Sequence, residues 1–80
     1  MARYMVLNTH SPEQCEQMEA DSDKLGAELR GKDFYCTCPA GEHAYYMFVD
    51  GDTAEQVLGY FPPSLKMGRT RALPVETMQL

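Results

Sequence analysis

The sequence predicts an α+β domain of the ferredoxin-like class, with the element order β-α-β-β-α-β. Three observations predict it. First, a segment with strand-forming residues is followed by a helix start with an N-cap. Second, two strand-like segments rich in aromatic residues lie on either side of a turn in the middle of the chain. Third, a second helix with an N-cap is followed by a last strand. In this arrangement a four-stranded antiparallel sheet carries two helices on one face. We expect residues 1–80 to form a single domain, with a core small enough to profit from metal binding or oligomerisation.

The first strand and first helix follow from local signals. Residues 2–9 are rich in residues that favour strands. Ser11 is a good N-cap, Pro12 suits the first helical position, and Gln14 completes a capping box. The helix is predicted over residues 12–30, because side chains recur at helical spacing. The positions of this stripe are Cys15, Met18, Ser22, Leu25 and Leu29.

A β-hairpin is predicted in the middle of the chain. Residues 32–39 form its first strand, which Pro39 ends, and the aromatic residues 43–50 form its second strand. The sequence Ala-Gly-Glu between them is typical of a turn. Because the two strands are joined by so short a connection, they are expected to pair antiparallel.

The last third of the chain predicts a helix and an edge strand. The helix covers residues 54–61 and is capped by Asp52 or Thr53. Residues 69–78 then form the fourth strand. Pro74 lies inside this strand and cannot donate a ladder hydrogen bond, which indicates a position at the edge of the sheet.

The third strand is apolar on both faces, which predicts self-association. Two helices cover only one face of the sheet, so the other face needs a second cover. The obvious cover is another copy of the chain, packed sheet to sheet as a dimeric α/β barrel. We therefore expect a homodimer or a higher homo-oligomer. The alternating residues are Ala44, Tyr46 and Phe48 on one side, and Tyr45, Met47 and Val49 on the other.

Charge and composition exclude several classes of partner. The formal net charge is -5, which argues against nucleic acid and anionic membranes as main partners. No apolar stretch reaches the length of a membrane span. We find no secretory signal and expect a cytoplasmic protein. In that compartment its three cysteines would be thiols, metal ligands or catalytic groups, since disulfides are rare there.

Two His–Cys pairs are the strongest functional signal. They are His10-x4-Cys15, at the junction of the first strand and helix, and Cys38-x4-His43, on either side of the hairpin turn. In the predicted topology both pairs lie at the same end of the sheet, because the first and third strands are neighbours. Two thiolates and two imidazoles suit tetrahedral Zn²⁺ and also Cu(I), and Ni²⁺ in a suitable geometry. The sequence thus predicts a metal site with Cys36 as a reserve ligand.

Other interpretations stay open at this point. Cys15 lies on the apolar stripe of the helix, and a buried cysteine often serves only as a small apolar core residue. Cys38 could instead be a reactive thiol with a histidine as its base. A further alternative is a small-molecule-binding or enzymatic barrel, isomerase-like or monooxygenase-like, in which His10 and Cys38 face a ligand pocket lined by Asn8 and Tyr46. The chain could also be a purely structural interaction module.

Four segments together resemble a known group of proteins. They are THSPEQC, CPAGEHAYYMFVD, DTAEQV and FPPSLKMGRTRALPVE, and they span most of the chain. The chain is similar to small dimeric α/β-barrel domains of unknown function, near the nickel-binding and muconolactone-isomerase-like groups. The resemblance implies a dimer and a metal or reactive site, and no particular reaction. The positions that match its pattern are His10, Pro12, Glu13, Cys15, Cys38, Gly41, Glu42 and His43.

Overall fold

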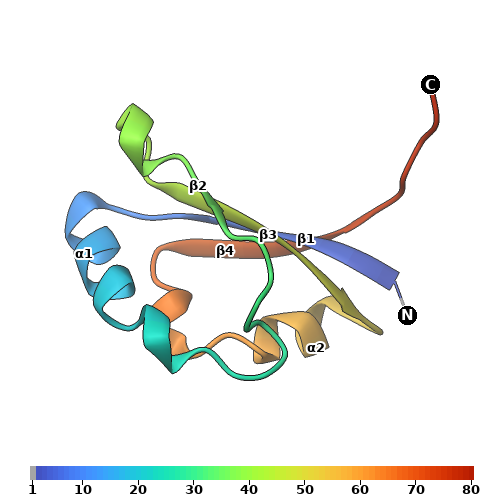
Figure 1. Ribbon diagram of the computed structural model, residues 1–80, viewed down its shortest axis with the longest axis horizontal. Coiled ribbons are helices and arrows are strands. Elements are labelled where there is room, and N and C mark those ends of the chain that lie inside the picture. Colours follow the sequence, from blue (N-terminus) through green and yellow to red (C-terminus); the bar gives the residue numbers. More distant parts are fainter. Residues whose placement is uncertain (1) are drawn as a thin grey trace.

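A single antiparallel sheet with two helices on one face makes up the fold, as predicted (Figure 1). The computed structural model describes residues 2–80. Its strand order is β2-β3-β1-β4, so β1 and β3 are central neighbours and β2 and β4 are edges. The strands are β1 (Ala2–Thr9), β2 (Tyr35–Cys36), β3 (Ala44–Gly51) and β4 (Arg69–Val75). The helices are α1 (Pro12–Ala20) and α2 (Ala54–Gly59).

The first helix is shorter than the predicted residues 12–30. It begins as expected, with the capping box between Ser11 and Gln14. It ends at Ala20 because the chain turns there into the short 3-10 helix Ser22–Lys24. The Ser22 hydroxyl donates a hydrogen bond to the carbonyl of residue 19, and such local bonds compete with helix continuation. Of the later stripe residues, Leu25 and Leu29 therefore reach the core from turns, whereas Ser22 is exposed.

The hairpin keeps its predicted place, but its first strand is much shorter than residues 32–39. Only Tyr35–Cys36 pair as a strand with β3. Pro39 has no N–H to donate, and the chain curls into the 3-10 turn Cys38–Ala40 instead. Gly41 ends this turn with φ 85°, a left-handed conformation that favours glycine. The turn lifts Cys38 out of the strand and toward the helix side of the molecule.

The remaining boundaries differ by a few residues from the prediction. Thr53 is the N-cap of α2, and its hydroxyl accepts a hydrogen bond from the amide of Gln56 at 3.1 Å. The helix ends at Gly59, two residues before the predicted end, and the 3-10 turn Pro63–Leu65 then begins at the second of the two prolines. β3 begins and ends one residue later than predicted. β4 ends at Val75 rather than at residue 78, and its position at the sheet edge agrees with the prediction from Pro74.

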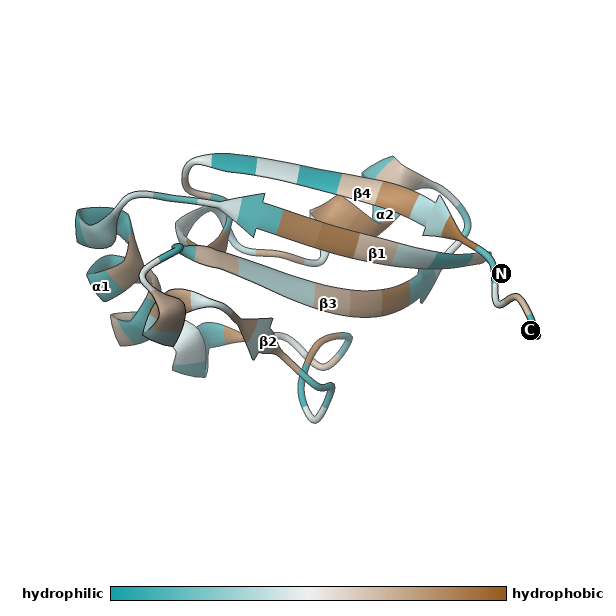
Figure 2. Cartoon of the chain, turned by 90° about the horizontal axis from the view of Figure 1, so that it is seen from above, coloured by the Kyte–Doolittle hydropathy of each residue, from teal (hydrophilic) through white to brown (hydrophobic). Residues whose placement is uncertain are grey.

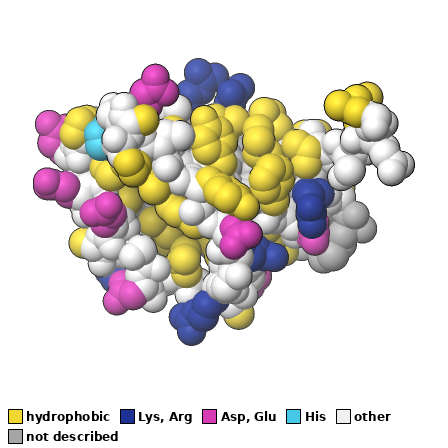
Figure 3. All heavy atoms as spheres, turned by 45° about the horizontal axis from the view of Figure 1, so that its top comes forward, with side chains coloured by type: hydrophobic (Ala, Val, Ile, Leu, Met, Phe, Trp, Pro, Cys, Tyr) yellow, Lys and Arg dark blue, Asp and Glu magenta, His cyan; other side chains and the backbone are white. Residues whose placement is uncertain are grey.

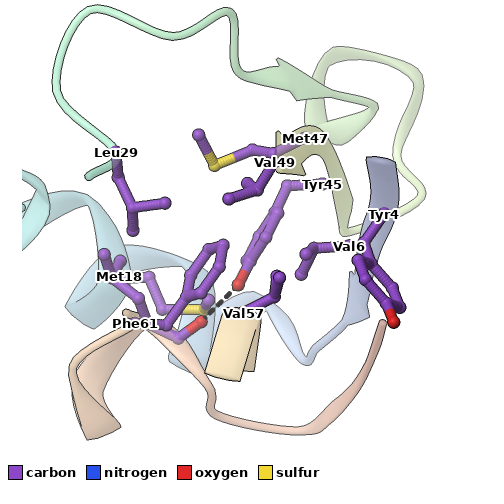
Figure 4. Close-up of a cluster of buried hydrophobic side chains, with 10 residues drawn as sticks. Tyr4, Val6, Met18, Leu29, Tyr45, Met47, Val49, Val57 and Phe61 are labelled. Atoms are coloured by element: carbon purple, nitrogen blue, oxygen red, sulfur yellow. Dashed lines mark hydrogen bonds between the residues drawn. The ribbon is translucent and has the colours of Figure 1, made fainter. Parts of the chain in front are cut away.

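The core lies between the sheet and the helices (Figure 4). At its centre the hydroxyl of Tyr45 donates a 2.6 Å hydrogen bond to the carbonyl of Leu65. Burial raises the pKa of this phenol, so the hydroxyl stays protonated. The buried apolar residues of this cluster are Tyr4, Val6, Met18, Leu29, Tyr45, Met47, Val49, Val57, Phe61 and Leu65.

The opposite face of the sheet is apolar and carries no helix. The register pairs Met5 with Phe48 and with Leu73, and these side chains point away from the core. Figure 2 looks onto this side of the sheet, where no helix lies over β1, β3 and β4, and Figure 3 shows hydrophobic side chains gathered there. Its members, called the open sheet face below, are Met5, Leu7, Tyr35, Tyr46, Phe48 and Leu73. Over residues 2–80, none of the helices has the length and apolar character needed to cross a membrane.

Candidate metal centre

The pairing of β1 with β3 brings the two histidines together. His10 directly follows β1, and His43 directly precedes β3. The amide of His10 donates a 3.0 Å hydrogen bond to the carbonyl of His43, which extends the ladder by one step. The two imidazole rings lie 5.8 Å apart between centroids, in an edge-to-face arrangement. The predicted approach of these residues is therefore confirmed.

The two cysteines come from two different segments, α1 and the hairpin turn, at the end of the sheet where the histidines lie. The capping box at Ser11 fixes the start of α1, so that Cys15, the fourth helical residue, turns toward the sheet. Cys38 begins the 3-10 turn of the hairpin. Their sulfur atoms are 3.4 Å apart, with Cys15 buried and Cys38 half-buried. The Cys15 thiol near the start of α1 thus meets a second thiol from a segment 23 residues away.

The four side chains converge to the dimensions of a metal site. One donor atom from each of His10, Cys15, Cys38 and His43 lies within 4.8 Å of all the others. The Cys38 sulfur is 3.9 Å from Nε2 of His10. A tetrahedral ion with bonds of about 2.0–2.3 Å holds its donor atoms about 3.3–3.8 Å apart. The spacing therefore needs only small movements to enclose an ion.

A hydrogen bond to Asn8 determines which ring nitrogen of His10 carries the proton. The side-chain amide nitrogen of Asn8 donates two hydrogen bonds of 2.7 Å, to the carbonyl of Met67 and to the hydroxyl oxygen of Thr70. Its side-chain oxygen must then accept at 2.6 Å from Nδ1 of His10. In the neutral ring this leaves Nε2 unprotonated and directed toward Cys38. Metal-binding histidines are commonly oriented by such a hydrogen bond on the other ring nitrogen.

His43 presents a buried nitrogen in need of a partner. Its Nδ1 is buried and makes no hydrogen bond within residues 2–80. Buried polar atoms are normally satisfied, so such an exception calls for an explanation. A bound ion would supply a partner for a ring nitrogen in this cluster. The donor set, the tautomer of His10 and this nitrogen all fit a transition metal.

The surroundings of Cys15 and His10 favour the uncharged forms of these two residues when no ion is bound. The hydrogen bond with Cys38, together with burial, raises the pKa of the Cys15 thiol to about 11. Burial, followed by the neighbouring charge of His43, lowers the pKa of His10 below its usual value. At neutral pH the Cys15 thiol therefore holds its proton, and His10 is an uncharged ligand. A metal ion must displace at least one thiol proton to bind.

An apolar pocket of about 250 Å³ opens beside the cluster. It lies between α1, the hairpin and the 3-10 turn Pro63–Leu65, on the helix side of the sheet. The third thiol, that of Cys36, also borders it. The lining residues are His10, Cys15, Met18, Glu19, Ser22, Leu25, Phe34, Cys36, Cys38, Tyr45 and Leu65.

The two residues expected to line a ligand pocket are placed elsewhere. Asn8 is fully buried on the helix side, where its hydrogen bonds hold His10. Tyr46 pairs with Leu7 and Tyr35 on the open sheet face. The two side chains therefore lie on opposite faces of one sheet. The positioning role of Asn8 was missed because its partners are about 60 residues away in the sequence.

Comparison with known proteins adds no relative: no family model, no curated protein and no solved structure matches the chain. The site must therefore be interpreted from its own geometry. That geometry defines an α+β domain with a two-histidine, two-cysteine cluster at one end of its sheet.

Proposed function

We propose that this protein binds one transition-metal ion through His10, Cys15, Cys38 and His43. The observation that carries the proposal is the convergence of these four donors within 4.8 Å. A tetrahedral arrangement of two thiolates and two imidazoles would favour Zn²⁺ or Cu(I) over Ni²⁺ in a square-planar site. Free thiols need a reducing compartment, which agrees with a cytoplasmic protein.

Such an ion would join three separate segments of a small domain. The donors come from the end of β1, the first turn of α1 and both ends of the hairpin turn. Four protein ligands complete the shell of a tetrahedral ion, which suits structural, storage or sensing roles. Because the unfolded chain holds no such arrangement, binding free energy adds to the free energy of unfolding.

Metal content is the direct test. The untagged protein, purified without chelator and analysed by elemental mass spectrometry, should carry about one ion per chain, as expected of a single four-ligand site. Cys38→Ser and His43→Ala should lose it. Cys36→Ser is the matched control, since it removes a hairpin thiol outside the cluster, and it should keep the ion. A wild-type protein that carries no metal and takes up neither Zn²⁺, Cu(I) nor Ni²⁺ would refute the proposal.

A second candidate function is binding of a small apolar molecule in the pocket. The pocket beside His10 and Cys38 favours it, because ligand sites are largely apolar with a few convergent polar groups. Indole is a suitable probe, and chemical shifts of the pocket residues would report its binding. Under this alternative the metal-free protein binds indole, and Leu25→Trp, which narrows the pocket, abolishes binding.

We also propose that the open sheet face joins two copies of the chain. The apolar members of the face lie on all four strands, with Arg71 beside Leu7 at its margin, and burying such a surface favours association. Sheets packed face to face, about 10 Å apart, would give the dimeric barrel that the sequence predicts. Phe48, at 43 % exposure, lies near the centre of this face.

A further inference from the structure

A third thiol lies beside the cluster without belonging to it. Cys36 lines the same pocket as Cys15 and Cys38, but only the latter two are among the four converging donors. The three differ in exposure: Cys36 is exposed, Cys38 is half-buried and Cys15 is buried. The thiols therefore form a series from solvent to the interior.

The backbone places Cys36 on the correct side of the sheet. It pairs with Tyr45, whose side chain is in the core, so both side chains lie on the helix face. β2 is an edge strand, which leaves the outer side of Cys36 without a neighbouring strand. Only one residue separates it from Cys38. An ion held by Cys36 would thus lie at the pocket opening, next to the cluster.

The rest of the pocket offers few other donors. Most of its wall is apolar, formed by side chains such as Met18, Phe34 and Leu65. Glu19 is the acidic residue among the described lining residues, and its charge would attract a cation. Soft or borderline ions prefer thiolate to carboxylate and hydroxyl ligands. The thiols are therefore the preferred ligands along this approach.

We infer that Cys36 is a transient ligand that receives the ion at the pocket opening and passes it to Cys38. This inference rests on the proposed function. The Cys36 thiol gives its proton to water and forms a thiolate–metal bond as a ligand of the incoming ion leaves. The bond to Cys38 then forms as the bond to Cys36 breaks; the Cys38 thiol proton goes to water, and the released Cys36 thiolate takes a proton back from water. No atom changes oxidation state. The ion is accordingly an exchangeable cargo rather than a permanent structural part.

Exchange kinetics test this role. A ligand that acts only during transfer changes the rates of uptake and release equally and leaves the equilibrium unchanged. We expect Cys36→Ser to slow both Zn²⁺ uptake and Zn²⁺ removal by a chromogenic chelator in stopped flow by about tenfold or more, the scale of losing a residue that supports the ligands of a metal site. The dissociation constant and stoichiometry should stay those of the wild type. Cys36→His, which restores a donor, should recover most of the rate.

Tyr35→Phe provides the matched control, because Tyr35 is the other residue of β2 and its side chain lies on the opposite face of the sheet. It should exchange metal like the wild type. Unchanged rates in Cys36→Ser would overturn the inference and leave the metal site itself standing. Loss of stoichiometric Zn²⁺ in Cys36→Ser would also overturn it, since Cys36 would then be a permanent ligand. A wild-type protein that binds no Zn²⁺, Cu(I) or Ni²⁺ would end both proposals.

Discussion

The side-chain oxygen of Asn8 accepts a 2.6 Å hydrogen bond from Nδ1 of His10 and so fixes which ring nitrogen faces Cys38. We predict that Asn8→Ala weakens Zn²⁺ binding by about 10–100-fold, the usual cost of removing such a partner. Chelator competition would measure it. Thr70→Val is the control, because it removes a partner of Asn8 and leaves His10 untouched. Equal losses in both variants would contradict a specific role of the Asn8–His10 bond.

Metal affinity should rise with pH. The Cys15 thiol has a pKa of about 11, so at neutral pH the metal-free protein holds a proton that binding must release. Each released proton lowers the dissociation constant about tenfold per pH unit, as long as the pH stays below that pKa. Competition titrations with Zn²⁺ between pH 6.5 and pH 8.5 (about two units, chosen to stay below the raised pKa) would give the slope. A dissociation constant independent of pH would show that the thiol is already ionised.

The metal-free protein should form a disulfide between Cys15 and Cys38. Their sulfur atoms are 3.4 Å apart, so a small movement suffices for bonding. Diamide would take up two electrons and two protons from the thiols and become the hydrazine. Peptide mapping by mass spectrometry should find this pair in the wild type and in Cys36→Ser. Bound Zn²⁺ should prevent diamide from oxidising these two thiols. A Cys36–Cys38 disulfide as the main product would contradict the prediction.

Replacing Gly68, in the connection into β4, by a residue with a side chain should destabilise the protein. The φ of Gly68 is 76°, and an added Cβ would lie 2.1 Å from the carbonyl oxygen of Thr9. Gly68→Ala must therefore shift the backbone next to His10, at a cost of at least about 1–3 kcal/mol. Gly59→Ala is the control, since Gly59 is helical with open space around it, and it should be neutral or stabilising. Urea unfolding would compare the two variants.

Association through the open sheet face predicts a monomerising variant. Phe48→Glu places a charge at the centre of that face, where burial against a second copy would be costly. Light scattering after size exclusion should find a dimer for the wild type and a monomer for this variant. Gln17→Glu adds the same charge at an exposed position of α1, and this control variant should remain dimeric. A monomeric wild type at high concentration would refute the dimer.

Several features could be predicted because short-range interactions decide them. The capping box at Ser11 and the N-cap Thr53 need only neighbouring residues, and both are present. A continuous run of apolar and aromatic residues predicts the central strand β3, and two helices on one face follow from the order of the elements. Both ends of β1 and the start of β4 were predicted correctly, whereas the bounds of β2 and β3 and the ends of β4, α1 and α2 were misplaced, because local hydrogen bonds such as that of Ser22 decide them residue by residue.

The sequence by itself determined the donor types, the two His–Cys spacings and the topology that makes them neighbours. Only the tertiary structure decided that their donor atoms come within 4.8 Å of one another. It also decided that Asn8 orients His10 and that Cys36 lies outside the cluster. The physical reason is register: which side chains meet across β1, β3 and β4 depends on pairing between residues far apart in the chain, and a shift of one residue would reverse every face.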